Sequence, residues 1–110
     1  MGDLDGSLTE SQRAIVLYDD LAKRAATDWS TVEDRADAHS DLADTLVALA
    51  ARRGTAAARQ QEYRARAIAE YQRALALYEG LRDKGVLPKA HEKYITELKE
   101  DVEKVRRAAR

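Results

Sequence analysis

Apolar residues recur at three- and four-residue spacing along nearly the whole chain, and no stretch alternates for long enough to form a strand. The composition points the same way, because the chain contains 21 alanines and 12 leucines but no phenylalanine and one proline. Alanine and leucine are strong helix formers, whereas strands are enriched in aromatic and β-branched residues. The sequence therefore predicts an all-α fold.

Three residues with side-chain hydroxyls stand where helix N-terminal caps are expected. Ser7 is followed three residues later by Glu10, and Ser30 by Glu33, which is the spacing of a capping box. Thr55 precedes the third apolar stripe, and its side-chain oxygen can accept a hydrogen bond from the free N–H groups of a first turn. These residues predict the starts of the first three helices.

Two glycines predict helix ends. Gly54 and Gly85 each follow basic residues directly, and glycine readily takes the left-handed conformation of a C-terminal cap. Val86 follows as in a Schellman ending, and Pro88 fits the first turn of a fourth helix. We expect a flexible segment over residues 1–6 and one helical domain over residues 7–110, with helices over about 7–27, 30–53, 55–84 and 88–109.

The apolar positions of each helix predict its buried face. In the second helix they are Val32, Ala36, His39, Leu42, Ala43, Leu46, Leu49 and Ala50. In the third they are Tyr63, Ala67, Ile68, Tyr71, Ala74, Leu75, Tyr78 and Leu81, and in the fourth His91, Tyr94, Ile95, Leu98, Val102, Val105 and Ala109. The opposite side of the third helix carries small residues that permit close approach of another helix, namely Ala58, Ala65, Ala69 and Ala76.

The chain echoes itself at an offset of 52 to 53 residues. The matching sets are Ala14, Ile15 and Tyr18 with Ala67, Ile68 and Tyr71, and Ala38, His39, Leu42 and Leu46 with Ala90, His91, Tyr94 and Leu98. Each unit comprises two helices, which predicts four antiparallel helices arranged as two stacked helix–turn–helix hairpins. A closed four-helix bundle would bury the same stripes and is the alternative.

The run from Ala67 to Leu75, AIAEYQRAL, resembles the second helix of a tetratricopeptide (TPR) repeat, with Tyr71 at the aromatic position. Leu42, Ala43 and Leu46 stand where the first helix of that repeat has its characteristic residues. The resemblance covers about residues 38–78, and the gap between the two motifs is longer than in the family, so both helices would be longer. It implies a non-catalytic adaptor or scaffold that binds another protein in a groove lined by the second and fourth helices. A self-associating four-helix bundle with a structural role is the alternative function.

Several classes of function lack their usual residues. No cysteine is present for a disulfide, a thiolate zinc site or a cysteine nucleophile. His39 and His91 have no ligand residue one turn away, so we expect each to lie at the edge of the core with a satisfied ring nitrogen rather than to bind a metal. Without a nucleophile–base pair or a Gly-rich phosphate loop, the sequence predicts neither an enzyme nor a cofactor.

The formal net charge of −1 and the absence of a nucleic-acid-binding motif argue against nucleic acid as a partner. No apolar run reaches the length of about 20 residues that a membrane span needs, and the acidic start MGDLDGSLTE is unlike a secretory signal. We therefore expect a cytoplasmic protein that does not bind membranes.

Four aspartates form the candidate partner-binding site: Asp34, Asp37, Asp41 and Asp44, here termed the aspartate row. Their spacing places them along one helix face, opposite the apolar stripe. The ordinary interpretation is a solvated surface, and the functional one is recognition of a basic partner. Because the row is expected to project into water, its replacement should hardly disturb the fold.

Charge is also divided along the chain. Residues 1–50 contain 11 acids and four bases, for a net −7, whereas residues 51–110 contain nine acids and 15 bases, for a net +6. One explanation is internal neutralisation of the aspartate row by Arg66 and Arg73. Another is association between molecules, in which the acidic hairpin of one copy meets the basic hairpin of the next.

Overall fold

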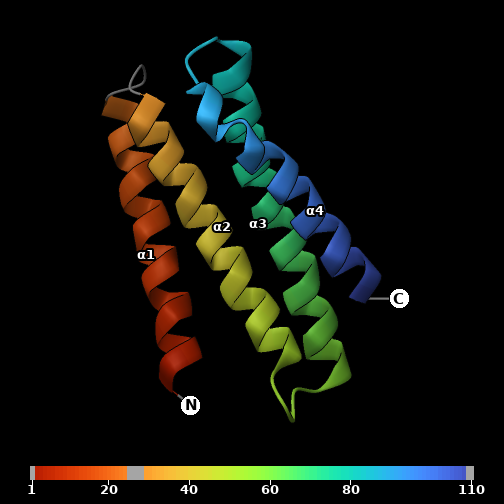
Figure 1. Ribbon diagram of the computed structural model, residues 1–110. Helices are drawn as coiled ribbons and strands as arrows, with labels where there is room; N and C mark the ends of the chain where they lie inside the picture. The colour runs from red at the N-terminus through yellow and green to blue at the C-terminus, as the bar shows by residue number, and fades with distance from the viewer. Residues whose placement is uncertain (1, 25–28, 109–110) are drawn as a thin grey trace.

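The computed structural model describes residues 2–24 and 29–108, and within them it has four α-helices, one short 3₁₀ helix and no strand. The helices are α1 (Gly2–Arg24), α2 (Trp29–Ala51), α3 (Ala57–Asp83) and α4 (Lys93–Ala108), and the 3₁₀ helix η1 (Lys89–His91) precedes α4 (Figure 1). The predicted all-α fold is confirmed. None of the helices in these ranges combines the length and the apolar character needed to cross a bilayer.

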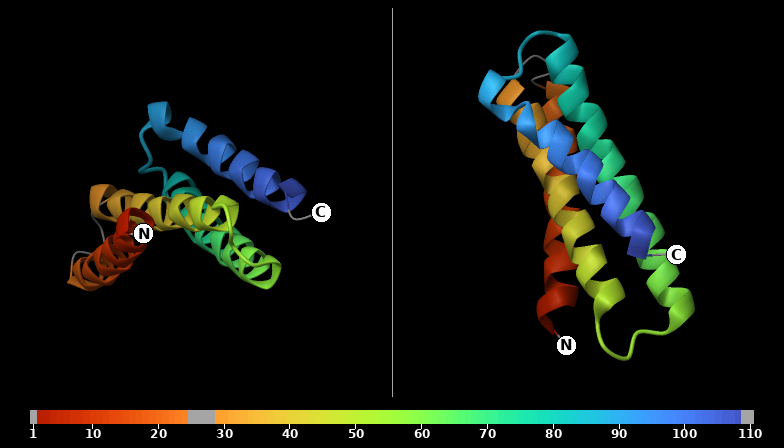
Figure 2. Two further views of the ribbon diagram at one scale, coloured as in Figure 1. Left: turned by 90° about the horizontal axis from the view of Figure 1, so that it is seen from below. Right: turned by 45° about the vertical axis from the view of Figure 1, so that its right-hand side comes forward.

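Consecutive helices run antiparallel and pack side by side, α1 on α2, α2 on α3 and α3 on α4 (Figure 1). The contact between α2 and α3 is the most extensive of the three. Viewed along the stack, α1 and α4 lie on opposite sides of α2 (Figure 2). Within the described residues no extensive contact joins α1 to α4, so the arrangement agrees with stacked hairpins and not with a closed bundle.

Four alanines explain why α2 and α3 pack so closely. Ala36 and Ala43 on α2, and Ala67 and Ala74 on α3, are fully buried. Small side chains at a helix crossing let the two axes approach each other. Within each pair the alanines are seven residues apart, so the close contact extends over two turns of both helices.

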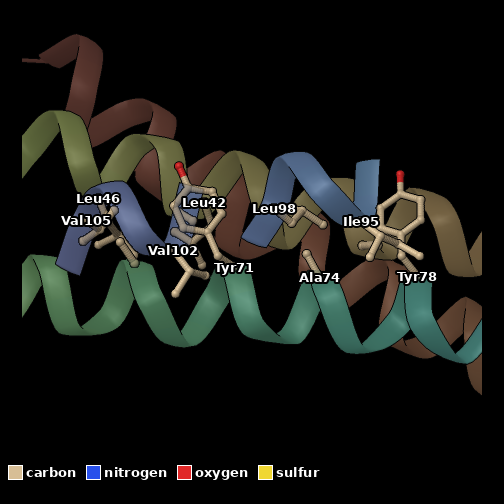
Figure 3. Close-up of a cluster of buried hydrophobic side chains, with 12 residues drawn as sticks. Leu42, Leu46, Tyr71, Ala74, Tyr78, Ile95, Leu98, Val102 and Val105 are labelled. Atoms are coloured by element: carbon tan, nitrogen blue, oxygen red, sulfur yellow. The ribbon is translucent and has the colours of Figure 1, made fainter. Parts of the chain in front are cut away.

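The hydrophobic core is shared by α2, α3 and α4. Leu46 of α2 lies beside Val105 of α4 and Leu42 lies beside the ring of Tyr71, whereas Tyr78 lies beside Ile95 at the other end of the core (Figure 3). The buried members of the apolar stripe of α4 are Ile95, Leu98, Val102 and Val105, as the sequence predicted. Burial of these side chains supplies most of the driving force for assembling three helices that would be marginal on their own.

Both predicted glycine stops are confirmed. Gly54 and Gly85 have φ angles of +88° and +74°, the left-handed region that residues with a Cβ rarely occupy. At Gly85 the Val86 N–H donates to the Leu81 carbonyl at 3.1 Å and the Gly85 N–H to the Arg82 carbonyl at 2.9 Å, which is a Schellman motif.

The predicted cap at Thr55 is wrong. The N-cap of α3 is Ala56, and no side chain caps it. The Thr55 hydroxyl instead donates to the carbonyl of Leu49 at 3.1 Å, which satisfies one of the free acceptors at the end of α2. The hydroxyl of a threonine between two helices can bond to the end of the first or to the start of the second, and Thr55 bonds to the end of α2.

Two other helix starts differ from the expected ones. α1 begins at Gly2 and contains Ser7 in its interior, because a Ser–Glu spacing of three also fits an internal turn. Pro88 is followed by η1, and α4 begins only at Lys93. The expected ends at residues 27 and 109 lie outside the described residues, and the flexibility expected of residues 1–6 stays a prediction.

Candidate functional site

Two members of the aspartate row accept hydrogen bonds from tyrosines of α3. The Tyr78 hydroxyl donates to Asp37 Oδ1 at 2.6 Å, and the Tyr71 hydroxyl donates to Asp44 Oδ1. Both rings are buried in the core and both hydroxyls point out of it in the same direction (Figure 3). Burial, and then the bond to a carboxylate, raises the pKa of each tyrosine above its ordinary value, so both remain donors.

This geometry corrects two expectations about the row. Asp37 and Asp44 do not simply project into water, because each connects α2 to α3 through a tyrosine. Internal neutralisation by Arg66 and Arg73 is also not what the structure shows. Arg73 pairs with Glu70, and both arginines line a hollow on the opposite flank of α2.

An acidic groove runs between α2 and α4, beginning at Asp37. Its volume is about 340 Å³. It is lined by Glu33, Asp37 and Ser40 of α2, Tyr78 of α3, His91 of η1, and Tyr94, Glu97, Leu98 and Asp101 of α4. Burial, and then the nearby carboxylate of Asp44, raises the pKa of Asp101. The groove therefore concentrates negative charge on a partly apolar surface.

Aromatic rings close one end of this groove. His91 donates from Nδ1 to Glu33 Oε2 at 2.6 Å, a bond that ties η1 to α2. The His91 ring lies between Trp29, at 6.3 Å between centroids, and Tyr94, at 5.3 Å. The Lys93 ammonium already lies 5.4 Å from the centroid of Tyr94, so that ring accepts a cation over its face.

The other members of the row face a second hollow, between α1 and α2. Asp34 and Asp41 line it together with Asp37 and with Glu10 of α1, and its volume is about 300 Å³. Burial, and then the carboxylates of Asp44 and Asp37, raises the pKa of Asp41. The aspartate row is thus a ridge between two acidic hollows, with Asp37 lining both.

Both histidines have the satisfied ring nitrogen that the sequence predicted. His39 is buried, and its Nδ1 lies 2.6 Å from Glu70 Oε1. Because a carboxylate can only accept, His39 carries its proton on Nδ1. Glu70 also accepts from Arg73, which leaves the buried carboxylate well compensated. In the part of the chain that the structure describes, no three His, Cys, Asp or Glu side chains gather as metal ligands would.

Sequence reasoning missed the glutamates that hold these histidines, Glu33 and Glu70. A signal was present for Glu70, which stands three residues after Ala67 and one before Tyr71, on the buried stripe of α3. A carboxylate on an apolar stripe needs a partner, and the only histidine on the stripe of α2 is His39. The contributions of Glu97 and Asp101 to the groove had no such signal.

Comparison with family models, with curated proteins and with solved structures gives no match to this chain. The resemblance to a TPR repeat therefore depends on the motifs within residues 38–78 alone.

Proposed function

We propose that this protein is a non-catalytic interaction module that binds a basic segment of another protein along the acidic groove between α2 and α4. The observation that carries the proposal is the composition of the groove wall. Four carboxylates, those of Glu33, Asp37, Glu97 and Asp101, line one hollow together with the rings of His91 and Tyr94. Lysine and arginine side chains combine a positive head with an apolar stem, so they suit such a surface.

Electrostatics favours a cationic occupant. Asp101 lines the groove, and burial, followed by the neighbouring carboxylate of Asp44, raises its pKa, so the ionised form of Asp101 is disfavoured in the free protein. A cation bound beside Asp101 would favour its ionised form, so the carboxylate and a positively charged occupant would stabilise each other. The same field accelerates encounter with a positively charged segment.

The TPR resemblance supports the location. In that family the first helix of each hairpin lines the groove, and here those positions correspond to α2 and α4. The observed groove is lined mainly by these two helices, with one ring each from Tyr78 of α3 and His91 of η1. We extend to this chain only the scaffold role, because the family has no catalytic residues to carry over.

The test uses two double variants with the same change of charge. Glu97→Gln/Asp101→Asn removes two groove carboxylates without touching the tyrosine bonds of α3. Glu100→Gln/Glu103→Gln, on the same helix but not among the groove-lining residues, is the control. Fluorescence anisotropy with arginine-containing peptides, and with versions in which glutamine replaces arginine, measures binding at low and high salt.

We expect arginine peptides to bind more tightly than glutamine peptides, with affinity that falls as salt screens the charges. The groove variant should weaken binding by about tenfold and the control by less than about twofold. Equal effects of the two variants would place binding elsewhere on α4, and affinity independent of arginine would refute the proposal.

A further inference from the structure

The turn between α2 and α3 carries a positively charged surface at one end of the molecule. A hollow of about 300 Å³ opens there, and among the described residues it is lined by Arg52, Arg53 and Arg59 and by no carboxylate. Arg52 already interacts with another group, so the charge available to a partner is that of Arg53 and Arg59, which are both exposed. We term these two arginines, with the hollow that they line, the arginine end.

The chain around the arginine end contains few acids. Residues 45–61 include three arginines and no aspartate or glutamate. Glu62 follows Arg59 by three positions, yet the two side chains form no ion pair in the structure. No side chain caps the first turn of α3, so its free N–H groups add partial positive charge. The arginine end therefore favours a partner that carries carboxylates.

The acidic groove between α2 and α4 has the complementary charge. Four carboxylates line it, and within the described ranges no lysine or arginine does. Glu97 and Asp101 form no ion pair with any described residue. Lys104 is close enough to lower the pKa of Asp101, but burial and the carboxylate of Asp44 outweigh it. Each of the two surfaces thus lacks the charge that the other supplies.

The two surfaces of one copy lie too far apart to meet. The groove is lined by residues 33–40 of α2 and 94–101 of α4, together with one residue each from α3 and η1, whereas the arginine end follows the last turn of α2. Figure 1 shows the start of α2 and η1 at one end of the molecule and the turn between α2 and α3 at the other. The molecule is 44 Å along its longest axis, so the contact requires two copies.

We propose that the acidic groove also binds the arginine end of a second copy of this chain, with Arg53 and Arg59 against the carboxylates of Glu97 and Asp101. This inference rests on the function proposed for the groove and adds self-association, which would compete with other basic partners for the same surface. The formal net charge of −1 leaves little overall repulsion between copies, so the local charges dominate their encounter. Both surfaces also contain tyrosine, which supplies apolar contact area.

Sedimentation velocity of the full chain measures self-association at low and high salt, at concentrations up to about 1 mM, where even a weak contact is populated. Arg53→Glu/Arg59→Glu reverses the charge of the arginine end. Arg106→Glu/Arg107→Glu makes the same change at the end of α4, on residues that line neither surface, and is its control.

A second pair of variants tests the groove. Glu97→Lys/Asp101→Lys reverses its charge, and Glu100→Lys/Glu103→Lys, on the same helix but not among the groove-lining residues, is the control. The decisive sample is an equal mixture of the groove variant and the arginine-end variant, because each supplies the intact surface that the other lacks. Circular dichroism checks that all variants remain folded.

We expect the mean mass of the unmodified protein to rise above that of the monomer as concentration increases, and to fall back at high salt. Each reversed variant should weaken association by about tenfold or more and each control by less than about twofold, and the mixture should restore association. An arginine-containing peptide should dissociate the assembly, because it occupies the same groove.

A protein that stays monomeric at every concentration, or association that survives either charge reversal, would overturn the proposal. If arginine peptides nevertheless bind the groove of that monomer, the function proposed for the groove stands and only self-association is wrong. If they do not bind, both proposals are wrong.

Discussion

Removing the two tyrosine-bonded carboxylates should destabilise the protein, whereas removing the other two should not. The perturbation is a pair of double variants, Asp37→Ala/Asp44→Ala and Asp34→Ala/Asp41→Ala. Both variants remove two charges from the same helix. In both, alanine also favours the helix over aspartate by about 0.5 kcal/mol per site, so this contribution cancels in the comparison. The difference between them therefore isolates the hydrogen bonds that Asp37 and Asp44 accept from α3.

The expected difference follows from the burial of the partners. A hydrogen bond to a charged group contributes about 1.5–3 kcal/mol, and the exposed position of both carboxylates lowers this to about 1 kcal/mol, because water can replace them. Asp37 and Asp44 are two turns apart, so the two losses should add to about 2 kcal/mol. In a domain of this size, that corresponds to a difference in Tm of about 8–16 °C.

Urea denaturation followed by far-UV circular dichroism measures the two free energies of unfolding at neutral pH. Tyr71→Phe/Tyr78→Phe provides a second route, because it removes the donors and should reproduce the loss. Combined with Asp37→Ala/Asp44→Ala it should cause little further loss, as expected for partners in one interaction. A difference below about 0.5 kcal/mol between the two aspartate variants would refute the reasoning, since the tyrosine bonds would then contribute nothing measurable.

Three further outcomes can be measured with the same denaturation assay. Glu70→Ala should cost about 1–3 kcal/mol, because it leaves the buried ring nitrogen of His39 without its acceptor, and Glu70→Gln should cost less, because it keeps an oxygen there. Gly85→Ala should lower the free energy of unfolding by about 1 kcal/mol, because Gly85 has a left-handed φ. Gly80→Ala should raise it by about 0.5–1 kcal/mol, because Gly80 lies inside α3 and an added methyl group has open space there. Effects of the same sign at the two glycines would contradict this prediction. Burial and like charges raise the pKa of Asp41, so the folded state holds that proton more tightly than the unfolded state, and stability is lost as the pH rises through the raised pKa. Asp41→Asn should therefore stabilise the protein at neutral pH and not at a pH below the usual range of a carboxyl pKa, and an equal gain at both would exclude the charge as the cause.

The helix boundaries show which structural features a few consecutive residues can predict. Gly54 and Gly85 end their helices as expected, because a left-handed cap is a property of a few consecutive residues. Ser7 and Thr55 do not start theirs, because a hydroxyl can also lie within a helix or bond the carbonyls of the preceding one. Stop signals were therefore more reliable than start signals in this chain.

For the candidate site, too, the sequence predicted positions on one helix but not the contacts between helices. Periodicity placed the four aspartates on one face of α2, and that placement is correct. It did not reveal that Tyr78 would reach Asp37, or that Glu97 and Asp101 of α4 would line a groove together with Asp37. The position of a residue on its own helix says nothing of what a neighbouring helix places opposite.

The sequence by itself determined that the chain is helical, roughly where the helices end and which face of α2, α3 and α4 is buried. These properties depend on the 3.6-residue period and on local backbone preferences, both of which are written in consecutive residues. Only the tertiary structure decided that α1 and α4 lie on opposite sides of α2, that His39 meets Glu70 and His91 meets Glu33, and that carboxylates and guanidinium groups line opposite flanks of one helix. The physical reason is that these pairings depend on how helices cross, and the crossing is set by how buried alanines and tyrosines from distant parts of the chain fit together.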